Sequence, residues 1–277
     1  MLIEDLKTIA SFHGADKWNS HWYAQHYERH FTRWRSRSLR LLEIGIGGFE
    51  GPTSGGASLR MWKQFFPLGT IVGLDINDKS GVAEDRIHVF QGSQTDTRVL
   101  GRIVDECGPF DLVVDDGSHC CEHVIATFEY LFQHGLKDDG VYAVEDLQTS
   151  YWGAYGGSSR LDSKGTSMAY FKRLCDQVNF CEWHRPNYRP SYLDLHVVAL
   201  HFYHNMVFVE KGDNNEGSNW VKDNCAPRHL RVTPHGLLLG GAAKLLKSSL
   251  RGSPAGTRML QSARSLWLRT QAIGRRR

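Results

Sequence analysis

Acidic residues and a histidine follow two predicted strands in the middle of the chain. The string Asp115-Asp116-Gly117-Ser118-His119 comes after one strand, and Glu145 and Asp146 come after the next. Ligands of open α/β sheets bind at the carboxyl ends of the strands, so we expect Asp116, Glu145 and Asp146 to converge there. Crowded carboxylates raise one another's pKa unless a cation neutralises them, and an all-oxygen cluster suits Mg²⁺. The pattern predicts a magnesium site.

His119 lies three residues beyond Asp116, so it is predicted to reach the same cluster. An imidazole titrates near neutral pH, which makes His119 the predicted general base. Each group also has an ordinary interpretation. Adjacent aspartates can form a turn, Glu145 and Asp146 can cap a helix, and a single histidine is often structural. Their joint placement at two neighbouring strand ends favours a reactive site.

A glycine-containing loop follows the first predicted strand, in the order Glu43-Ile44-Gly45-Ile46-Gly47. Gly45 and Gly47 would let the backbone turn tightly and approach a ligand. A full GxGxxG pattern is absent because position 50 is a glutamate. The acid Glu43 could hold an ammonium group but would repel a pyrophosphate. The loop therefore favours S-adenosylmethionine over NAD as the cofactor.

Two further segments are predicted to contact that cofactor. Asp75 ends the second strand, where an acid can accept hydrogen bonds from ribose hydroxyls; a turn or a helix cap is the alternative. Residues 91–96, with Gln94 among them, follow the third strand and would lie beside the adenine. An ordinary turn in which Asp96 caps the next helix is an equal alternative.

An aromatic loop, 147–157, comes directly after Glu145 and Asp146. We expect Gln148, Tyr151 and Trp152 to contact the substrate, because aromatic rings with polar neighbours suit a sugar or another ring. A purely structural loop is the alternative.

Five short apolar runs alternate with helical patterns, which predicts a doubly wound, mostly parallel α/β sheet. The predicted strands are 39–44, 70–75, 87–91, 110–115 and 140–145, and the predicted helices are 58–66, 97–106, 122–134 and 167–179. Two later runs, 196–200 and 206–210, predict an antiparallel hairpin around a turn at 201–205. A parallel sheet closed by such a hairpin resembles the Rossmann-like fold of class I methyltransferases more than that of a dinucleotide dehydrogenase.

Composition divides the chain into parts. The 277 residues carry a formal net charge of +3, but residues 1–223 hold 22 basic and 30 acidic residues, whereas 224–277 hold 11 basic residues and no acid. We expect a helical lid at 1–38, a methyltransferase domain at 39–212, a polar loop at 213–236 and a basic amphipathic tail at 237–277. The aromatic stripe of 1–38 could instead be a packing face.

The tail has several interpretations. Its residues could lie on an anionic membrane, pack on an acidic neighbouring subunit of a homo-oligomer, or remain in solvent. No nucleic-acid recognition motif accompanies its charge, so no nucleic-acid partner is expected. The sequence contains no apolar run that could span a membrane, no secretory signal and no paired zinc-type cysteines. These features predict a cytoplasmic protein, with contact at the inner membrane face as an option.

Taken together, these segments resemble the Mg²⁺-dependent, S-adenosylmethionine-dependent sugar O-methyltransferases of macrolide biosynthesis, over about residues 16–212. The strings that carry the resemblance are Asp16-Lys17, 27–31, 41–48, 55–62, 73–76, 89–92, 115–119, 145–152 and 201–205. The resemblance implies a metal held by Asp116, Glu145 and Asp146, His119 as the base, and a sugar-containing substrate.

The same resemblance implies further cofactor contacts from Lys17, Ser58, Asp115 and Asp116. It leaves open which sugar and which hydroxyl would be methylated. Three rival functions are a metal-dependent methyltransferase of catechols or phenols, an NAD-dependent sugar oxidoreductase, and a non-catalytic binding module. The oxidoreductase is disfavoured because the chain has no Tyr-x-x-x-Lys pair.

Overall fold

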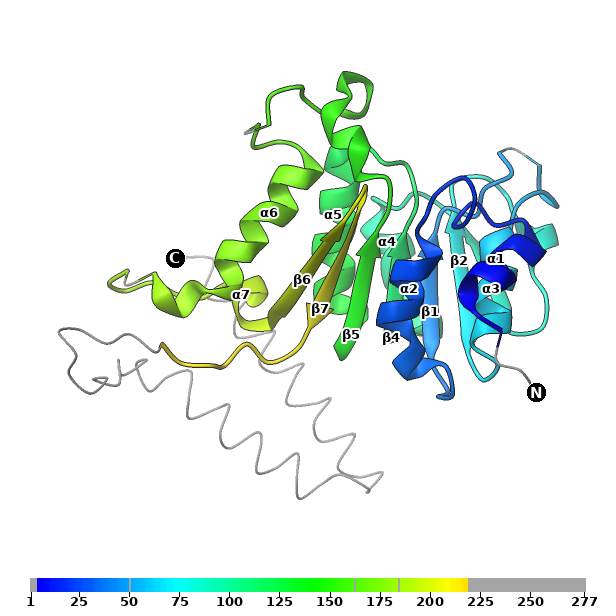
Figure 1. Ribbon diagram of the computed structural model, residues 1–277, viewed down its shortest axis with the longest axis horizontal. Coiled ribbons are helices and arrows are strands. Elements are labelled where there is room, and N and C mark those ends of the chain that lie inside the picture. Colours follow the sequence, from blue (N-terminus) through cyan, green and yellow to red (C-terminus); the bar gives the residue numbers. More distant parts are fainter. Residues whose placement is uncertain (1–3, 50, 162, 184, 219–277) are drawn as a thin grey trace, which may run out of the picture. The chain divides into compact units, whose positions relative to one another are not determined.

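The computed structural model describes residues 4–49, 51–161, 163–183 and 185–218, and the predicted tail at 237–277 lies outside these residues. Compact unit 1 of the chain is 1–217. Its centre is a seven-stranded sheet in the order β3-β2-β1-β4-β5-β7-β6 (Figure 1). The strands are β1 (Arg40–Ile44), β2 (Thr70–Asp75), β3 (Ile87–Gln91), β4 (Phe110–Asp115), β5 (Leu136–Val144), β6 (Val197–Tyr203) and β7 (Met206–Lys211).

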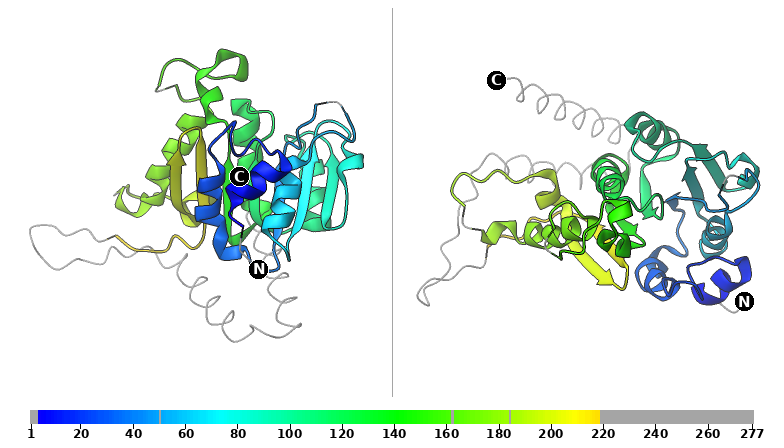
Figure 2. Two further views of the ribbon diagram at one scale, coloured as in Figure 1. Left: turned by 45° about the vertical axis from the view of Figure 1, so that its right-hand side comes forward. Right: turned by 90° about the horizontal axis from the view of Figure 1, so that it is seen from above.

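Helices cover both faces of this sheet because side chains alternate between the faces along each strand. Leu41, Ile71 and Leu112 pack with α1 (Leu6–His13), α2 (Ala24–Phe31) and α3 (Ala57–Phe65). Their neighbours Leu42, Val72 and Val113 pack with α4 (Thr97–Cys107), α5 (Cys121–His134) and α6 (Ser167–Val178). In Figure 2 the blue N-terminal helices accordingly lie over one face of the sheet. A short helix, α7 (Tyr192–His196), leads into β6.

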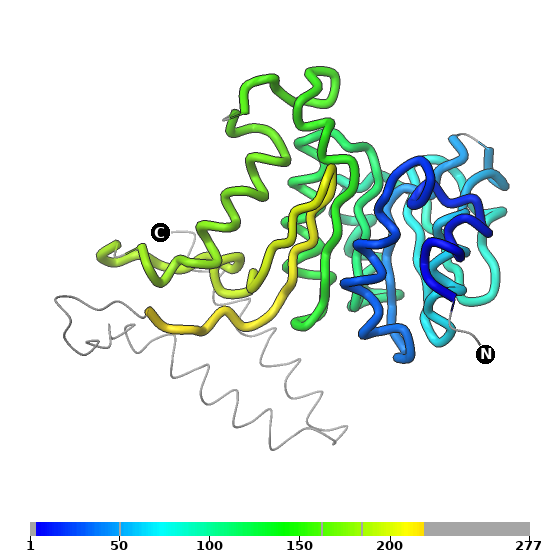
Figure 3. Tube along the Cα trace, in the orientation of Figure 1, coloured from blue at the N-terminus to red at the C-terminus, as the bar shows by residue number. Residues whose placement is uncertain are grey.

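The first five strands run parallel, whereas β7 and β6 are antiparallel and form a hairpin beside β5 (Figure 3). The predicted doubly wound, mostly parallel sheet with an antiparallel hairpin is thus confirmed. Its parallel register also aligns the carboxyl ends of the strands: Ile44 is level with Asp115, and Asp115 with Val144. The residues that follow β1, β4 and β5 therefore meet at one edge.

The bounds of two strands differ from the predictions by more than one residue. β5 begins at Leu136, ahead of the predicted 140, and ends at Val144, so Glu145 is the first residue beyond the strand. The hairpin turn was predicted at 201–205, but β6 continues to Tyr203, which pairs with Met206. Only two residues are needed for the turn because Asn205 adopts a left-handed conformation with φ 62°, which asparagine tolerates well.

The N-terminal segment is less helical than the prediction of a helical lid at 1–38 implied. Asp5 caps α1, and Gly14, with φ 67°, ends it. The chain then runs without regular structure until α2, which continues into a 3₁₀ turn at Thr32–Trp34. The aromatic stripe is buried: Tyr23, Tyr27, Phe31 and Trp34 are at most 3% exposed and belong to the core on this face of the sheet.

No helix within the described residues is long and apolar enough to cross a membrane.

Candidate active site

The glycine loop forms one wall of a cavity at the carboxyl edge of the sheet. Gly45 adopts φ 86°, and a Cβ there would lie 2.1 Å from the backbone oxygen of Asp116, so only glycine allows this approach. Asp75 Oδ2 accepts a hydrogen bond from the Ile46 N–H at 2.9 Å and so braces the loop from β2. The cavity is lined by Gly14, Asp16, Gly45, Ile46, Gly47, Gly48, Gly55, Ala57, Ser58 and Asp116.

Glu43 lies at the end of β1 with its side chain completely buried. It lies two residues after Leu41, so its side chain points toward the same face of the sheet, which α1–α3 cover. Neither carboxylate oxygen accepts a hydrogen bond from a described residue, and the nearby cation is Lys17 Nζ, 3.5 Å from Oε1. Burial raises the pKa of Glu43 to about 7, against the opposing influence of Lys17. A buried carboxylate without donors is a position at which a ligand cation would be stabilised.

A single buried ammonium, Lys17 Nζ, lies among the acids of this edge. It forms a short ion pair with Asp116, lies 3.1 Å from Glu145 Oε2, and lies 3.6 Å from Asp16. Burial alone would lower the pKa of Lys17, but Asp116 and Glu145 raise it, so the group is charged. The resemblance implied that Lys17 contacts the cofactor, whereas the structure directs its ammonium into the acid cluster.

Two tyrosines of the N-terminal segment hold the acids that follow β5. Tyr27, on α2, donates a hydrogen bond to Glu145 Oε1 at 2.5 Å, and Tyr23 donates one to Asp146 Oδ1 at 2.6 Å. Glu145 is 3% exposed. Burial and the nearby Asp116 raise the pKa of Glu145 well above its ordinary value, against the opposing effect of Lys17.

Asp146 is more open than Glu145. Burial would raise its pKa, but the Tyr23 hydrogen bond and the neighbouring His119 outweigh that effect and lower it. The backbone of Asp146 is left-handed, with φ 54°, and that of His119 is too, with φ 57°. Such conformations cost free energy in non-glycine residues and concentrate at functional sites.

Asp116, His119 and Asp146 come together as a possible ligand set. One ligand atom from each lies within 4.8 Å of the others. His119 Nε2 is 4.0 Å from Asp116 Oδ1 and 3.7 Å from Asp146 Oδ2. The predicted group of three acids is thus divided: Glu145 turns toward Tyr27 and Lys17, and His119 takes the place beside the other two. The convergence followed from the strand ends, but the direction of each side chain depends on the N-terminal segment.

Gln94 and Asp115 are bonded to the protein rather than directed into the cavity. Gln94 Nε2 donates to Asp115 Oδ1 at 3.2 Å and to Thr127 Oγ1 at 3.1 Å, and its Oε1 accepts from the Ser118 N–H. Asp115 also accepts from the Tyr142 hydroxyl at 3.1 Å. These hydrogen bonds fix the position of the loop 115–119. Asp96 caps α4 by accepting a hydrogen bond from the Arg98 N–H. This agrees with the alternative in which residues 91–96 form a turn that caps the next helix.

The aromatic loop forms two 3₁₀ turns, Leu147–Tyr151 and Gly153–Tyr155. Tyr151 and Trp152 are 41% and 50% exposed, which is unusual for such large side chains. Gln148 Oε1 is buried without a hydrogen-bond partner among the described residues.

The sequence pattern did not predict that Tyr23, Tyr27 and Lys17 hold the acids. The aromatic spacing of 23 and 27 was visible in the sequence, but the pattern did not reveal that their hydroxyls would reach carboxylates more than 100 positions away.

No protein-family profile matches the chain. Two curated relatives are each 46% identical over 222 residues, 78% of this chain. They are mycinamicin VI 2''-O-methyltransferase of Micromonospora griseorubida, of which 55% is covered, and demethylmacrocin O-methyltransferase of Streptomyces fradiae, of which 56% is covered. Over this region the chain belongs to the family of sugar O-methyltransferases of macrolide and tetracenomycin pathways. It spans about half the length of these relatives.

A solved structure gives the same result for the fold. The methyltransferase of the mycinamycin biosynthetic pathway, in complex with Mg, SAH and mycinamycin VI, is 45% identical to this chain and superimposes with a TM-score of 0.75. The comparison covers 80% of this chain and 57% of that one. The predicted class I methyltransferase fold and the predicted family are both confirmed.

Gly45→Ala tests the tight approach of the glycine loop to β4. The added Cβ would collide with the Asp116 backbone, so we expect the free energy of unfolding in urea to fall by about 1–3 kcal/mol. Gly153→Ala is the matched control, because a Cβ there meets no atom within 4 Å; its effect should stay within about 0.5 kcal/mol. Equal stability of the two variants would show that the loop has room at Gly45.

Proposed function

We propose that this protein is an S-adenosylmethionine- and Mg²⁺-dependent O-methyltransferase that methylates a sugar hydroxyl of a glycosylated small molecule. The observation that carries the proposal is the grouping of Asp116, His119 and Asp146 at the strand ends, next to a glycine-lined cavity. The family supports it: the related structure contains Mg, SAH and mycinamycin VI, and two relatives are named as O-methyltransferases of rhamnosyl tetracenomycin-C compounds.

The cofactor would bind along the glycine loop. Glu43 supplies a buried carboxylate close to Ser58, and a ligand ammonium there would favour its ionised form. Gly45, Gly47 and Ser58 line the cavity and leave space for that part of the ligand. Asp75 is half-buried at the end of β2, where the ribose would lie, although its oxygens also brace the loop. We assign Gln94 and Asp115 to supporting this pocket through the loop 115–119.

The donor set fits a hard divalent cation. Four carboxylates, those of Asp16, Glu43, Asp116 and Glu145, lie within 4.0 Å of Lys17 Nζ, and Asp146 lies 3.7 Å from His119 Nε2, so acids outnumber the lysine at this edge. Oxygen donors of this kind prefer Mg²⁺. Asp116 and Asp146 would hold the ion, and Glu145 would join them after its carboxylate turns away from Tyr27 and Lys17. When bound, the sulfonium cofactor supplies an electrophilic methyl group and the metal lowers the pKa of a coordinated hydroxyl.

The residues of the chain would position the acceptor and remove its proton. Tyr151 and Trp152 offer exposed aromatic faces to a sugar ring, and Gln148, half-buried in the same loop, would contact the substrate beside them. His119 would accept the hydroxyl proton at Nε2, the ring nitrogen that faces Asp116 and Asp146. Tyr23 and Tyr27 keep the two acids after β5 in fixed orientations. Such positioning is the main contribution that a protein makes to methyl transfer.

We also propose a role for each of the other segments of the chain. Residues 1–38 would act as a lid that also forms a wall of the cavity through Gly14 and Asp16, and 39–212 would be the catalytic domain. The polar loop 213–236 would connect this domain to the basic tail 237–277. We further propose a cytoplasmic homo-oligomer in which the tail contacts either a neighbouring subunit or an anionic membrane surface.

A screen of acceptors tests the function. The full chain is incubated with labelled S-adenosylmethionine, Mg²⁺ and three sets of acceptors: glycosylated macrolides and aromatic polyketides, free vicinal-diol sugars, and catechols. We expect label to enter a glycosylated acceptor and EDTA to abolish the transfer. Transfer only to catechols would favour the phenol methyltransferase, and undiminished transfer in EDTA would refute the metal requirement. Absence of any heat of binding with S-adenosylmethionine would favour a binding module.

His119→Asn tests the general base. Loss of a positioned base slows proton transfer by about 10²–10⁴-fold, so we expect turnover of the identified acceptor to fall by that factor. Affinity for S-adenosylmethionine, measured by calorimetry, should be unchanged. The control is His88→Asn, at an exposed position of β3. A variant with normal turnover would show that another group takes the proton.

A further inference from the structure

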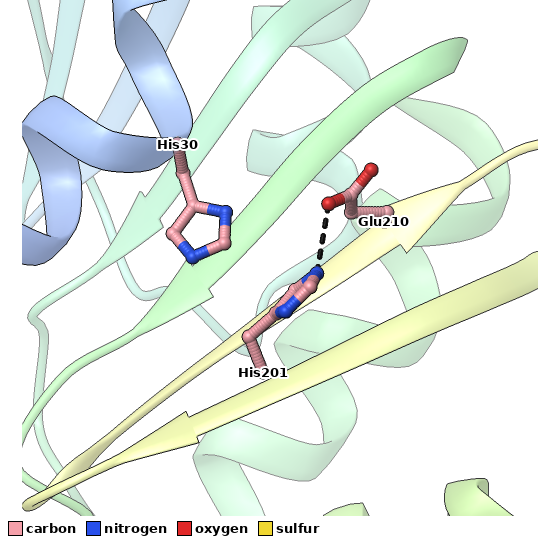
Figure 4. Close-up of side chains that lie close together, drawn as sticks. All are labelled: His30, His201 and Glu210. Atoms are coloured by element: carbon pink, nitrogen blue, oxygen red, sulfur yellow. Dashed lines mark hydrogen bonds and ion pairs between the residues drawn. The ribbon is translucent and has the colours of Figure 1, made fainter.

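A second cluster of ligand-type side chains lies between the N-terminal segment and the hairpin. His30 comes from α2, His201 from β6 and Glu210 from β7, and the three point toward one another (Figure 4). One ligand atom from each lies within 4.8 Å of the other two. None of the three belongs to the acid cluster at the strand ends, and none has a part in the methyl transfer proposed above.

The strand register explains why the cluster forms. His201 pairs with Phe208 and Ala199 pairs with Glu210, so His201 and Glu210 lie on the same face of the hairpin, two residues apart along it. α2 covers that face: the ring of His30 stacks on Phe208 with 4.3 Å between centroids. The distance between His201 and His30 ring centroids is 4.5 Å. Three separate, regular elements thus fix the three side chains.

The distances suit a transition-metal ion. His201 Nε2 and Glu210 Oε1 are 2.9 Å apart. Two ligands at about 2.0 Å from one tetrahedral ion are separated by about 3.3 Å, so a small rotation would admit the ion between them. His201 is 37% exposed in its side chain, which leaves one side of the cluster open for water as a further ligand.

The surrounding groups are those expected around such a site. The Tyr203 hydroxyl is 2.9 Å from His30 Nε2 and orients that ring, as partners of metal-binding histidines commonly do. Arg33 lies 3.6 Å from the second oxygen of Glu210 and holds the carboxylate in place. The guanidinium of Arg33 offsets the charge of Glu210, so metal binding at this cluster would depend mainly on the two imidazoles.

We propose that His30, His201 and Glu210 form a binding site for a borderline divalent transition-metal ion of the Zn²⁺ class. Two imidazoles and one carboxylate favour such an ion over Mg²⁺, which prefers oxygen donors. The ion would fasten α2 to the β6–β7 hairpin. Since α2 also carries Tyr27, which holds Glu145, the second site would stabilise the helix that borders the first.

The test uses Co²⁺ as a visible probe for the Zn²⁺ class. The full chain, without a histidine tag, is stripped with EDTA, desalted, saturated with Mg²⁺ and titrated with Co²⁺. We expect one ion to bind with visible absorption bands that added Zn²⁺ removes. His201→Asn and Glu210→Gln should each weaken Co²⁺ binding by at least about 10–100-fold. Urea unfolding in EDTA shows whether each variant is folded.

Two controls separate this site from others. His88→Asn removes an exposed histidine elsewhere and should leave the Co²⁺ bands unchanged. Asp146→Asn removes a member of the acid cluster and should leave them as well. Absence of bands in the unaltered chain, their retention in folded His201→Asn and Glu210→Gln, or their loss in Asp146→Asn alone would each overturn the proposal.

Discussion

The burial of Glu145 is the constraint on which the arrangement of this protein depends. A carboxylate taken out of water needs partners, and here both come from the N-terminal segment: the hydroxyl of Tyr27 and the ammonium of Lys17. The arrangement of acids at the strand ends therefore requires that the N-terminal segment packs on this face of the sheet. That packing is secured by an aromatic core in which Phe31 contacts Trp62 and Phe208. The N-terminal segment and the carboxyl edge of the sheet therefore belong to one structural unit.

The need of buried carboxylates for partners also explains how several acids can lie close together at this edge. Lys17 compensates part of their charge, but Glu43 still lacks a hydrogen-bond donor, and Asp146 faces the more open side with His119. A sheet edge with this residual negative charge is suited to cations, both organic and inorganic. The membership of the chain in a family of sugar O-methyltransferases agrees with that chemistry, while the match extends over about half of the relatives' length.

Much of the fold could be predicted because fully covered strands have a simple signature. The bounds of β2, β3 and β4 coincide with the predicted apolar runs, and the parallel topology then placed Asp116, Glu145 and Asp146 at one edge. The orientation of Glu145 could not be predicted, because it depends on hydroxyls that approach from α2. The partners of Gln94 could not be predicted either. Its amide could equally well have bound a ligand, but in the structure it donates to Asp115 and Thr127. The cluster of His30, His201 and Glu210 likewise depends on a packing contact that no local pattern reveals.

The central claim is that the acids at the strand ends form a cation site built by the fold. Calorimetric titration of Mg²⁺ into the full chain, with S-adenosylmethionine present, tests it most directly when the unaltered chain is compared with Asp146→Asn. We expect one bound Mg²⁺ per chain and an affinity at least about tenfold weaker in the variant. Absence of Mg²⁺ binding in the unaltered chain, or equal affinity in the two proteins, would contradict it.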